Sequence, residues 1–80
     1  MYNIKPFDIE NDTLKELPNI RASNVEELYT LSEGIEYATI MFGDQTAGNI
    51  LNGDVAWTAA HFNTHPEVSD AFFAREDSQW

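Results

Sequence analysis

The apolar residues of the segment Ser23–Glu33 recur at the spacing of one helical face. The residues on this face are Val25, Leu28 and Tyr29. Ser23 and Glu26 have the spacing of a capping box, and Gly34 is placed to stop the helix. The pattern therefore predicts a helix over Ser23–Glu33.

Three other segments carry shorter helical signals, and one segment is expected to be extended. Thr13–Glu16 repeats the capping-box spacing just ahead of a proline. Alanines favour a helix over residues 54–62, and Pro66 suits the first position of a final helix. Met1–Ile9 is expected to be extended, because Pro6 disfavours helical geometry at the residue before it.

Residues 35–57 allow two interpretations. Tyr37–Phe42 is rich in β-favouring residues, and Asn52–Gly53 is a strong hairpin signal. The same Asn52–Gly53 pair also suits the end of one helix and the start of the next. We therefore predict a mainly α fold, a small compact bundle of four or five short helices. The alternative is an α+β fold with a small hairpin or sheet around residues 37–57.

The composition indicates one small domain. A chain of 80 residues is expected to form a single domain over residues 1–80, with a core that depends on ten aromatic side chains. The absence of cysteine excludes disulfides and thiolate metal sites. No apolar stretch approaches the roughly 18 residues of a membrane span, and the first ten residues lack a signal-peptide pattern. We therefore expect a cytoplasmic protein.

The sequence offers little that is typical of catalysis or metal binding. His61 and His65 are four residues apart, which on a helix would direct both imidazoles to one metal. Pro66 biases His65 away from helical geometry, so we expect the two histidines to lie on either side of a helix boundary. The serines and glycines match no nucleophile or phosphate-binding motif. We predict no catalytic residue, no metal site and no cofactor.

Charge is the main functional signal. Fourteen acidic residues and four basic ones give a formal net charge of −10. This charge disfavours direct binding to nucleic acid or to an anionic membrane, and it favours a basic protein surface as the partner. The candidate partner-binding residues form two runs: Asp8, Glu10, Asp12 and Glu16, then Glu26, Glu27, Glu33 and Glu36. The same acidity would also keep a small protein soluble without any partner.

In size and charge the chain resembles the small acidic inhibitors made by bacteriophages, including anti-restriction and anti-CRISPR proteins. The resemblance implies a non-enzymatic inhibitor that docks on a positively charged, nucleic-acid-binding surface, as a nucleic-acid mimic does. It assigns no role to any residue. The alternative is an apolar interaction module or self-associating adaptor subunit that uses aromatic anchors. The aromatic candidates for that alternative are Tyr37, Trp57, Phe72, Phe73 and Trp80.

Overall fold

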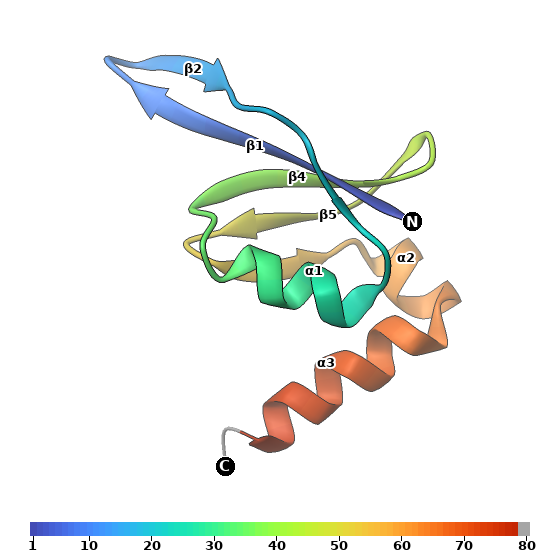
Figure 1. The fold of residues 1–80 in the computed structure, drawn as a ribbon. Coiled ribbons are helices and arrows are strands. Elements are labelled where there is room, and N and C mark those ends of the chain that lie inside the picture. The colour runs from blue at the N-terminus through green and yellow to red at the C-terminus, as the bar shows by residue number, and fades with distance from the viewer. Residues whose placement is uncertain (79–80) are drawn as a thin grey trace.

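The computed structural model describes the backbone of residues 1–78 and the side chains of residues 1–74, so Trp80 lies outside the described residues. Six antiparallel strands are the main element of this part of the chain, and three helices accompany them (Figure 1). The strands are β1 (Tyr2–Glu10), β2 (Thr13–Glu16), β3 (Ile20–Ala22), β4 (Tyr37–Phe42), β5 (Gln45–Leu51) and β6 (Asp54–Trp57). The helices are α1 (Val25–Ser32), α2 (Ala59–Thr64) and α3 (Pro66–Ser78).

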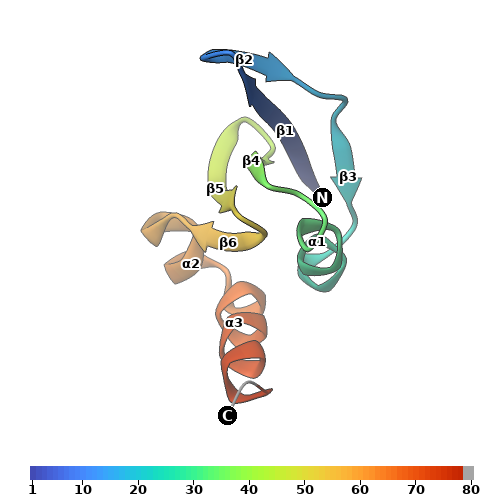
Figure 2. The ribbon, with the colours of Figure 1, turned by 90° about the vertical axis from the view of Figure 1, so that its left-hand side faces the viewer.

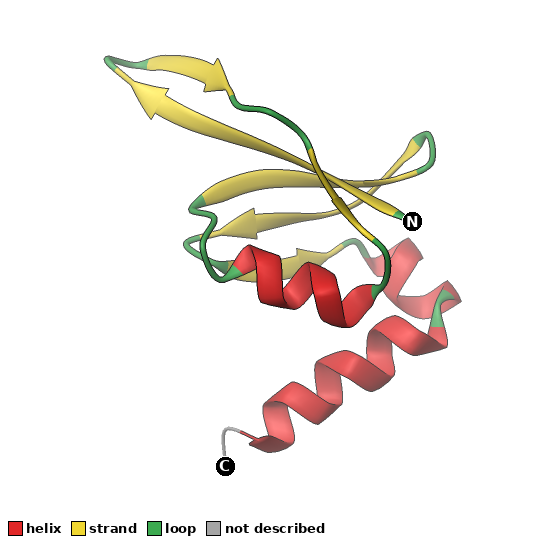
Figure 3. Cartoon of the chain, in the orientation of Figure 1, coloured by secondary structure: helices red, strands yellow, loops and turns green. Residues whose placement is uncertain are grey.

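The strands form one sheet in the order β2-β1-β4-β5-β6. Strand β3 shares the outer edge of β1 with β2: β3 pairs with Tyr2–Ile4, and β2 pairs with Phe7–Glu10. In Figure 3 the three helices lie together below the sheet, and the β1–β2 hairpin projects beyond them. Figure 2 shows that the sheet curves, with the hairpin at one end and β6 beside α2 at the other.

The core lies between the sheet and the helices, and strict alternation along β1 shows how it is built. Tyr2, Ile4 and Pro6 are buried, whereas the intervening residues belong to the opposite face of the sheet. The other strands and the helices add further buried side chains to the same layer: Ala38, Ile40, Ala47, Ile50, Val25, Leu28, Tyr29 and Val68. The opposite face of the sheet carries no helix within the described residues.

The prediction of a helical bundle was wrong, because two tight turns close hairpins: one was missed and the other was interpreted as a helix boundary. Asn11 and Asp12 both have positive φ, 53° and 63°, and join β1 to β2 in a two-residue turn. Thr13–Glu16 is therefore a strand that pairs with β1, not a capped helix. Asn52–Gly53 forms the same kind of turn, with φ of 53° and 82°, between β5 and β6.

The helical prediction for residues 54–62 was wrong over its first half. Asp54–Trp57 is strand β6, and helix begins only at Ala59, after Thr58 caps its start. Backbone pairing with β5 outweighs the helix propensity of the alanines in this segment. The extended N-terminal segment and the final helix starting at Pro66 were predicted correctly.

The start of α1 differs from its prediction by one residue. The N-cap is Asn24, whose side-chain oxygen accepts a hydrogen bond of 2.8 Å from the backbone amide of Glu27. The Glu27 carboxylate in turn accepts a bond of 3.2 Å from the amide of Ser23. Glu27, rather than Glu26, therefore occupies the acidic position of the cap.

None of the helices in the described residues is long and apolar enough to cross a membrane.

Candidate binding groove

A groove of about 530 Å³ opens at the hairpin end of the molecule. It lies between the second half of β1, the segment 17–20 that joins β2 to β3, and the loop 34–37 that joins α1 to β4. Most of its lining is apolar, from Pro6, Phe7, Leu17, Pro18, Ile20, Ile35 and Tyr37. We call it the acidic groove, because Asp8 and Glu36 also line it.

Two of the lining residues, Phe7 and Tyr37, stack their rings on each other on the face of the sheet opposite to Asp8 and Glu36. The ring centroids of Phe7 and Tyr37 are 5.9 Å apart, and the planes differ by 15°. The β1–β4 register pairs Pro6 with Ala38, which brings Phe7 beside Tyr37. Both side chains are half-buried, so part of each ring remains accessible.

The electrostatic character of the acidic groove is negative. Its described lining holds the carboxylates of Asp8 and Glu36 but no Lys, Arg or His. Glu33 caps the C-terminus of α1 and directly precedes Gly34, another lining residue. The C-terminal end of a helix carries a partial negative charge, so α1 adds to the field of the carboxylates. A cation is therefore favoured in this groove.

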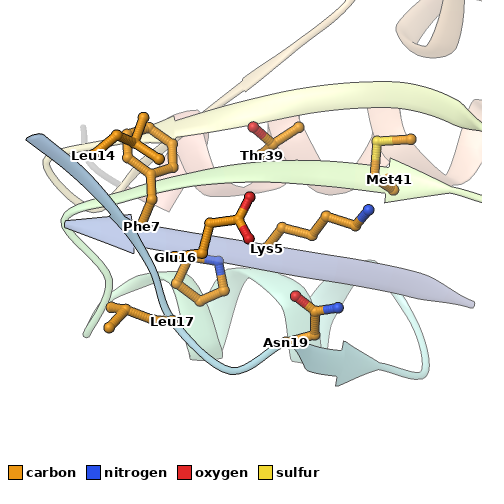
Figure 4. Close-up of a pocket in the computed structure, with 9 residues that line it drawn as sticks. Lys5, Phe7, Leu14, Glu16, Leu17, Asn19, Thr39 and Met41 are labelled. Atoms are coloured by element: carbon orange, nitrogen blue, oxygen red, sulfur yellow. The ribbon is translucent and has the colours of Figure 1, made fainter.

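A second hollow, of about 430 Å³, adjoins the acidic groove on the face of the sheet without helices. The two share Pro6, Phe7, Leu17 and Asn19. In Figure 4, Lys5 extends along the sheet toward Met41, and Glu16 lies beside the stem of Lys5.

Exposed apolar side chains surround the second hollow. Ile9 and Leu14 face each other across the hairpin and are 57% and 58% exposed. Leu51 lies opposite Tyr37 in the ladder and is 52% exposed. The face of the sheet without helices therefore offers apolar contact area next to the acidic groove.

The structure brings together only part of the predicted acidic surface. The residues in or beside the acidic groove are Asp8, Glu33 and Glu36. Those elsewhere on the β1–β2 hairpin are Glu10, Asp12 and Glu16, and those at the start of α1 are Glu26 and Glu27. Helix α1 separates Glu26 from Glu33 by about 10 Å along its axis, since each residue adds about 1.5 Å. The four acidic residues predicted for α1 and its loop therefore do not form one site.

The apolar half of the acidic groove was not predicted from the sequence. Phe7, Leu17 and Ile35 were not singled out, and Tyr37 was considered only as an anchor for an apolar interface. The alternation of Tyr2, Ile4 and Pro6 could have indicated that Phe7 faces away from the core. Nothing local to Leu17 or Ile35 could have placed them beside it.

The two histidines belong to a buried aromatic cluster, where His61 is only 8% exposed. A hydrogen bond of 2.7 Å joins the hydroxyl of Tyr2 to Nε2 of His61. The rings of His61 and His65 stack with centroids 3.9 Å apart, and the ring of Trp57 stacks on that of His61 with centroids 5.4 Å apart. His61 lies within α2 and His65 follows its end, as predicted, and the curved sheet brings the ring of Tyr2 against His61.

Burial keeps both partners of this hydrogen bond neutral. It raises the pKa of Tyr2 to about 12, with a smaller contribution from the Glu67 carboxylate. Burial also lowers the pKa of His61; the neighbouring His65 lowers it further, and Glu67 opposes the shift. Among the described residues, no group of three His, Cys, Asp or Glu side chains is placed to hold a metal ion.

We expect the free energy of unfolding to fall as the pH is lowered below about 6.5, the ordinary pKa of histidine. The pKa of His61 is depressed in the fold, so the unfolded chain binds its proton first, and the loss continues down to the folded pKa. Urea unfolding of the wild type and of His61→Gln between about pH 5 and 8 measures the effect. The difference between the two proteins isolates His61 from the acidic surface. Parallel pH profiles would contradict the assignment.

The fold and the groove define a small α+β domain with a curved antiparallel sheet, helices on one side, and an acidic groove at the hairpin end. No protein-family model matches the sequence, and neither a curated protein nor a solved structure shows significant similarity to it.

Proposed function

We propose that the protein is a non-enzymatic binding protein that docks through its hairpin end onto a positively charged surface of a partner protein. The observation that carries this proposal is the convergence of Asp8 and Glu36 on one groove. They come from the two separate acidic runs of the sequence, and their groove has apolar walls. Protein interfaces combine such apolar contact area with complementary charge, which speeds association and selects the partner.

The proposed effect of docking is inhibition of a partner that uses its basic surface to bind nucleic acid. The net charge of −10 along a longest axis of 38 Å gives roughly one charge per 4 Å. A strand of duplex DNA carries one phosphate charge per about 3.4 Å. The protein is therefore comparable in linear charge density to one strand, and it would compete with nucleic acid for such a surface.

Reversing the charges of the groove is expected to abolish capture of the partner. Asp8→Lys with Glu36→Lys replaces two attractive carboxylates by two cations that a basic surface repels. The matched control, Asp44→Lys with Asp70→Lys, changes the net charge equally at exposed positions outside the groove. Tagged proteins are incubated with lysate, and the captured partner is quantified by mass spectrometry. We expect a loss of about tenfold or more for the groove variant and less than about twofold for the control.

Equal losses in the two double variants would show that only net charge matters and would contradict docking through the hairpin end. The far-ultraviolet circular dichroism of each variant shows whether its fold is retained. Glu27 is left unchanged in these variants, because it caps α1 and its loss would affect stability.

The second candidate function is an apolar interaction module or self-associating subunit. The exposed side chains of Ile9, Leu14 and Leu51 on the face without helices favour it. The same capture experiment in low and high salt separates the two functions. If charge drives docking, the affinity falls as the salt concentration rises. If apolar contacts drive association, the affinity is unchanged or increases.

A further inference from the structure

The outer edge of β2 presents backbone groups to solvent at the hairpin end of the molecule. Strand β2 stands last in the sheet order, and all four of its residues are exposed. In Figure 2 it lies at the end of the sheet that is far from the helices. Within residues 1–78, β1 is the only strand that pairs with β2. An exposed strand edge of this kind is a template for pairing with another chain.

The two-residue turn of the β1–β2 hairpin decides which backbone groups of β2 point outward. Glu10 and Thr13 flank the turn as a hydrogen-bonded pair, and bonded and non-bonded pairs alternate from there. Lys15 is therefore bonded to β1, whereas the N–H and C=O groups of Leu14 and Glu16 point away from it. An added strand can form hydrogen bonds with both N–H groups and both C=O groups of these two residues.

A second copy of this chain is a poor match for the edge of β2. Residues directly opposite each other in an antiparallel pair point to the same face, so two copies pair either about Leu14 or about Lys15. Pairing about Lys15 sets two lysines opposite each other and Glu16 opposite Leu14. Pairing about Leu14 brings Glu16 against the turn residue Asp12, which has the same charge. Like charges directly opposite are destabilising, so the edge favours a strand of different sequence.

The side chains of β2 define the sequence of that strand. Leu14 and Glu16 belong to the face of the sheet without helices, where Leu14 is 58% exposed beside Ile9. An apolar residue opposite Leu14 extends this apolar contact, and a cation opposite Glu16 forms a cross-strand charge pair. On the other face, Lys15 already has Asp8 opposite it in β1, so an uncharged residue suffices there.

We propose that β2 is the docking edge for an extended segment of the partner protein, added antiparallel, with a lysine or arginine opposite Glu16 and an apolar residue opposite Leu14. Antiparallel addition continues the pairing of the rest of the sheet and is the slightly more stable arrangement. The backbone hydrogen bonds supply affinity, and the two side chains fix the register. This inference rests on the proposed function and specifies how the hairpin end holds a basic partner.

A peptide titration followed by two-dimensional amide NMR tests the proposal. The probe is acetyl-Thr-Arg-Thr-Ile-Thr-Thr-amide, which sets its arginine opposite Glu16 and its isoleucine opposite Leu14. We expect saturable shifts at residues 13–17 and a dissociation constant in the millimolar range, because only a few hydrogen bonds form. We also expect slower hydrogen exchange at the amides of Leu14 and Glu16 but not at that of Lys15, which already faces β1.

Two N-methylated forms of the peptide are a matched pair. Methyl groups on the amides of arginine and isoleucine block the bonds to Glu16 and Leu14, and we expect them to abolish binding. Methyl groups on the amides of the third and fifth residues, which point away from β2, are expected to change binding by less than about threefold. A peptide with glutamate in place of arginine is expected to bind several-fold more weakly than the parent, because glutamate repels Glu16.

The comparison of Leu14→Pro with Leu14→Val tests the same bonds from the side of the protein. Proline is tolerated in an edge strand where the N–H faces solvent, so it removes one outward donor without breaking the β1–β2 ladder. Valine keeps the donor and has a side chain of similar size. We expect peptide binding to be about fivefold weaker or more for Leu14→Pro than for Leu14→Val. The dispersion of the amide spectrum reports whether each variant is folded.

Equal binding of the two N-methylated peptides would overturn the proposal, and so would the absence of saturable shifts at residues 13–17 up to about 10 mM peptide. Equal binding of the parent peptide by Leu14→Pro and Leu14→Val would also overturn it. These failures are distinguishable from failure of the proposed function. If capture of the partner is lost on reversing Asp8 and Glu36 but is equal for the two Leu14 variants, docking stands and strand addition at β2 falls.

Discussion

Replacing Gly48 by alanine is expected to lower the free energy of unfolding by about 3 kcal/mol or more. Gly48 pairs with Trp57 across the β5–β6 ladder. A Cβ atom at this position would overlap the carbonyl oxygen of Ala56 and lie 3.1 Å from Cα of Trp57. These are backbone atoms, so no side-chain rotation relieves the overlap, and β5 and β6 would have to separate.

The position of Gly48 beside a bulge explains why the strands approach so closely. The β4–β5 register shifts between Ile40 and Met41, which leaves Ala47 as an additional residue in β5. A bulge bends its strand and increases the local twist. The bend brings the backbone of β5 at Gly48 against that of β6, and only glycine has room there.

Urea unfolding followed by circular dichroism measures the effect of Gly48→Ala. The matched control is Gly34→Ala, because a Cβ at Gly34 would meet no atom within 4 Å and its φ is not positive. We expect the control to change stability by less than about 1 kcal/mol, in the stabilising direction if at all. A domain of this size has only about 4–12 kcal/mol of stability in total. A Gly48→Ala protein as stable as its control would show that β5 and β6 are not packed as described.

Replacing Tyr2 by alanine is expected to destabilise the fold by about 3–5 kcal/mol. Tyr2 is only 4% exposed and contacts three rings, with centroid distances of 4.9 Å to Phe42, 5.7 Å to Trp57 and 5.5 Å to His61. Alanine would leave a cavity among them. It would also leave the buried Nε2 of His61 without its 2.7 Å hydrogen bond.

Tyr2→Phe separates the two losses, because it keeps the ring and removes the hydroxyl. We expect it to cost about 1–3 kcal/mol, the penalty of an unsatisfied buried polar group. Both variants are compared with the wild type by urea unfolding at neutral pH. A Tyr2→Ala protein within about 1 kcal/mol of the wild type would contradict the role of Tyr2 as a link between the sheet and α2. Equal losses in the two variants would assign the whole effect to the hydrogen bond.

The fold was predicted where one segment carries its own structural signal. Pro6 correctly indicated that Met1–Ile9 is extended, and Pro66 correctly indicated the start of the last helix. The prediction failed where a local helix signal competes with pairing to a neighbouring strand. Thr13–Glu16 has the spacing of a helix cap, yet all four residues are exposed in a strand that exists only because β1 lies beside it.

The candidate site was predicted in part for a related reason. Acidity identified Asp8 and Glu36 among eight candidates, but it did not separate them from Glu26 and Glu27 at the far end of α1. That separation depends on where the hairpin and the loop 34–37 meet. The proximity of Phe7 and Tyr37 also depends on tertiary structure, because their stacking follows from the β1–β4 register.

The sequence by itself determined the strong negative charge, the lack of cysteine chemistry, the apolar face of α1 and the turn-forming pair Asn52–Gly53. These are properties of composition or of a few adjacent residues. The tertiary structure alone decided that the turns close hairpins, that His61 is buried against Tyr2, and that two acidic residues from separate runs line one groove. Strand pairing joins residues far apart in the chain, and its free energy depends on the partner strand rather than on local propensity.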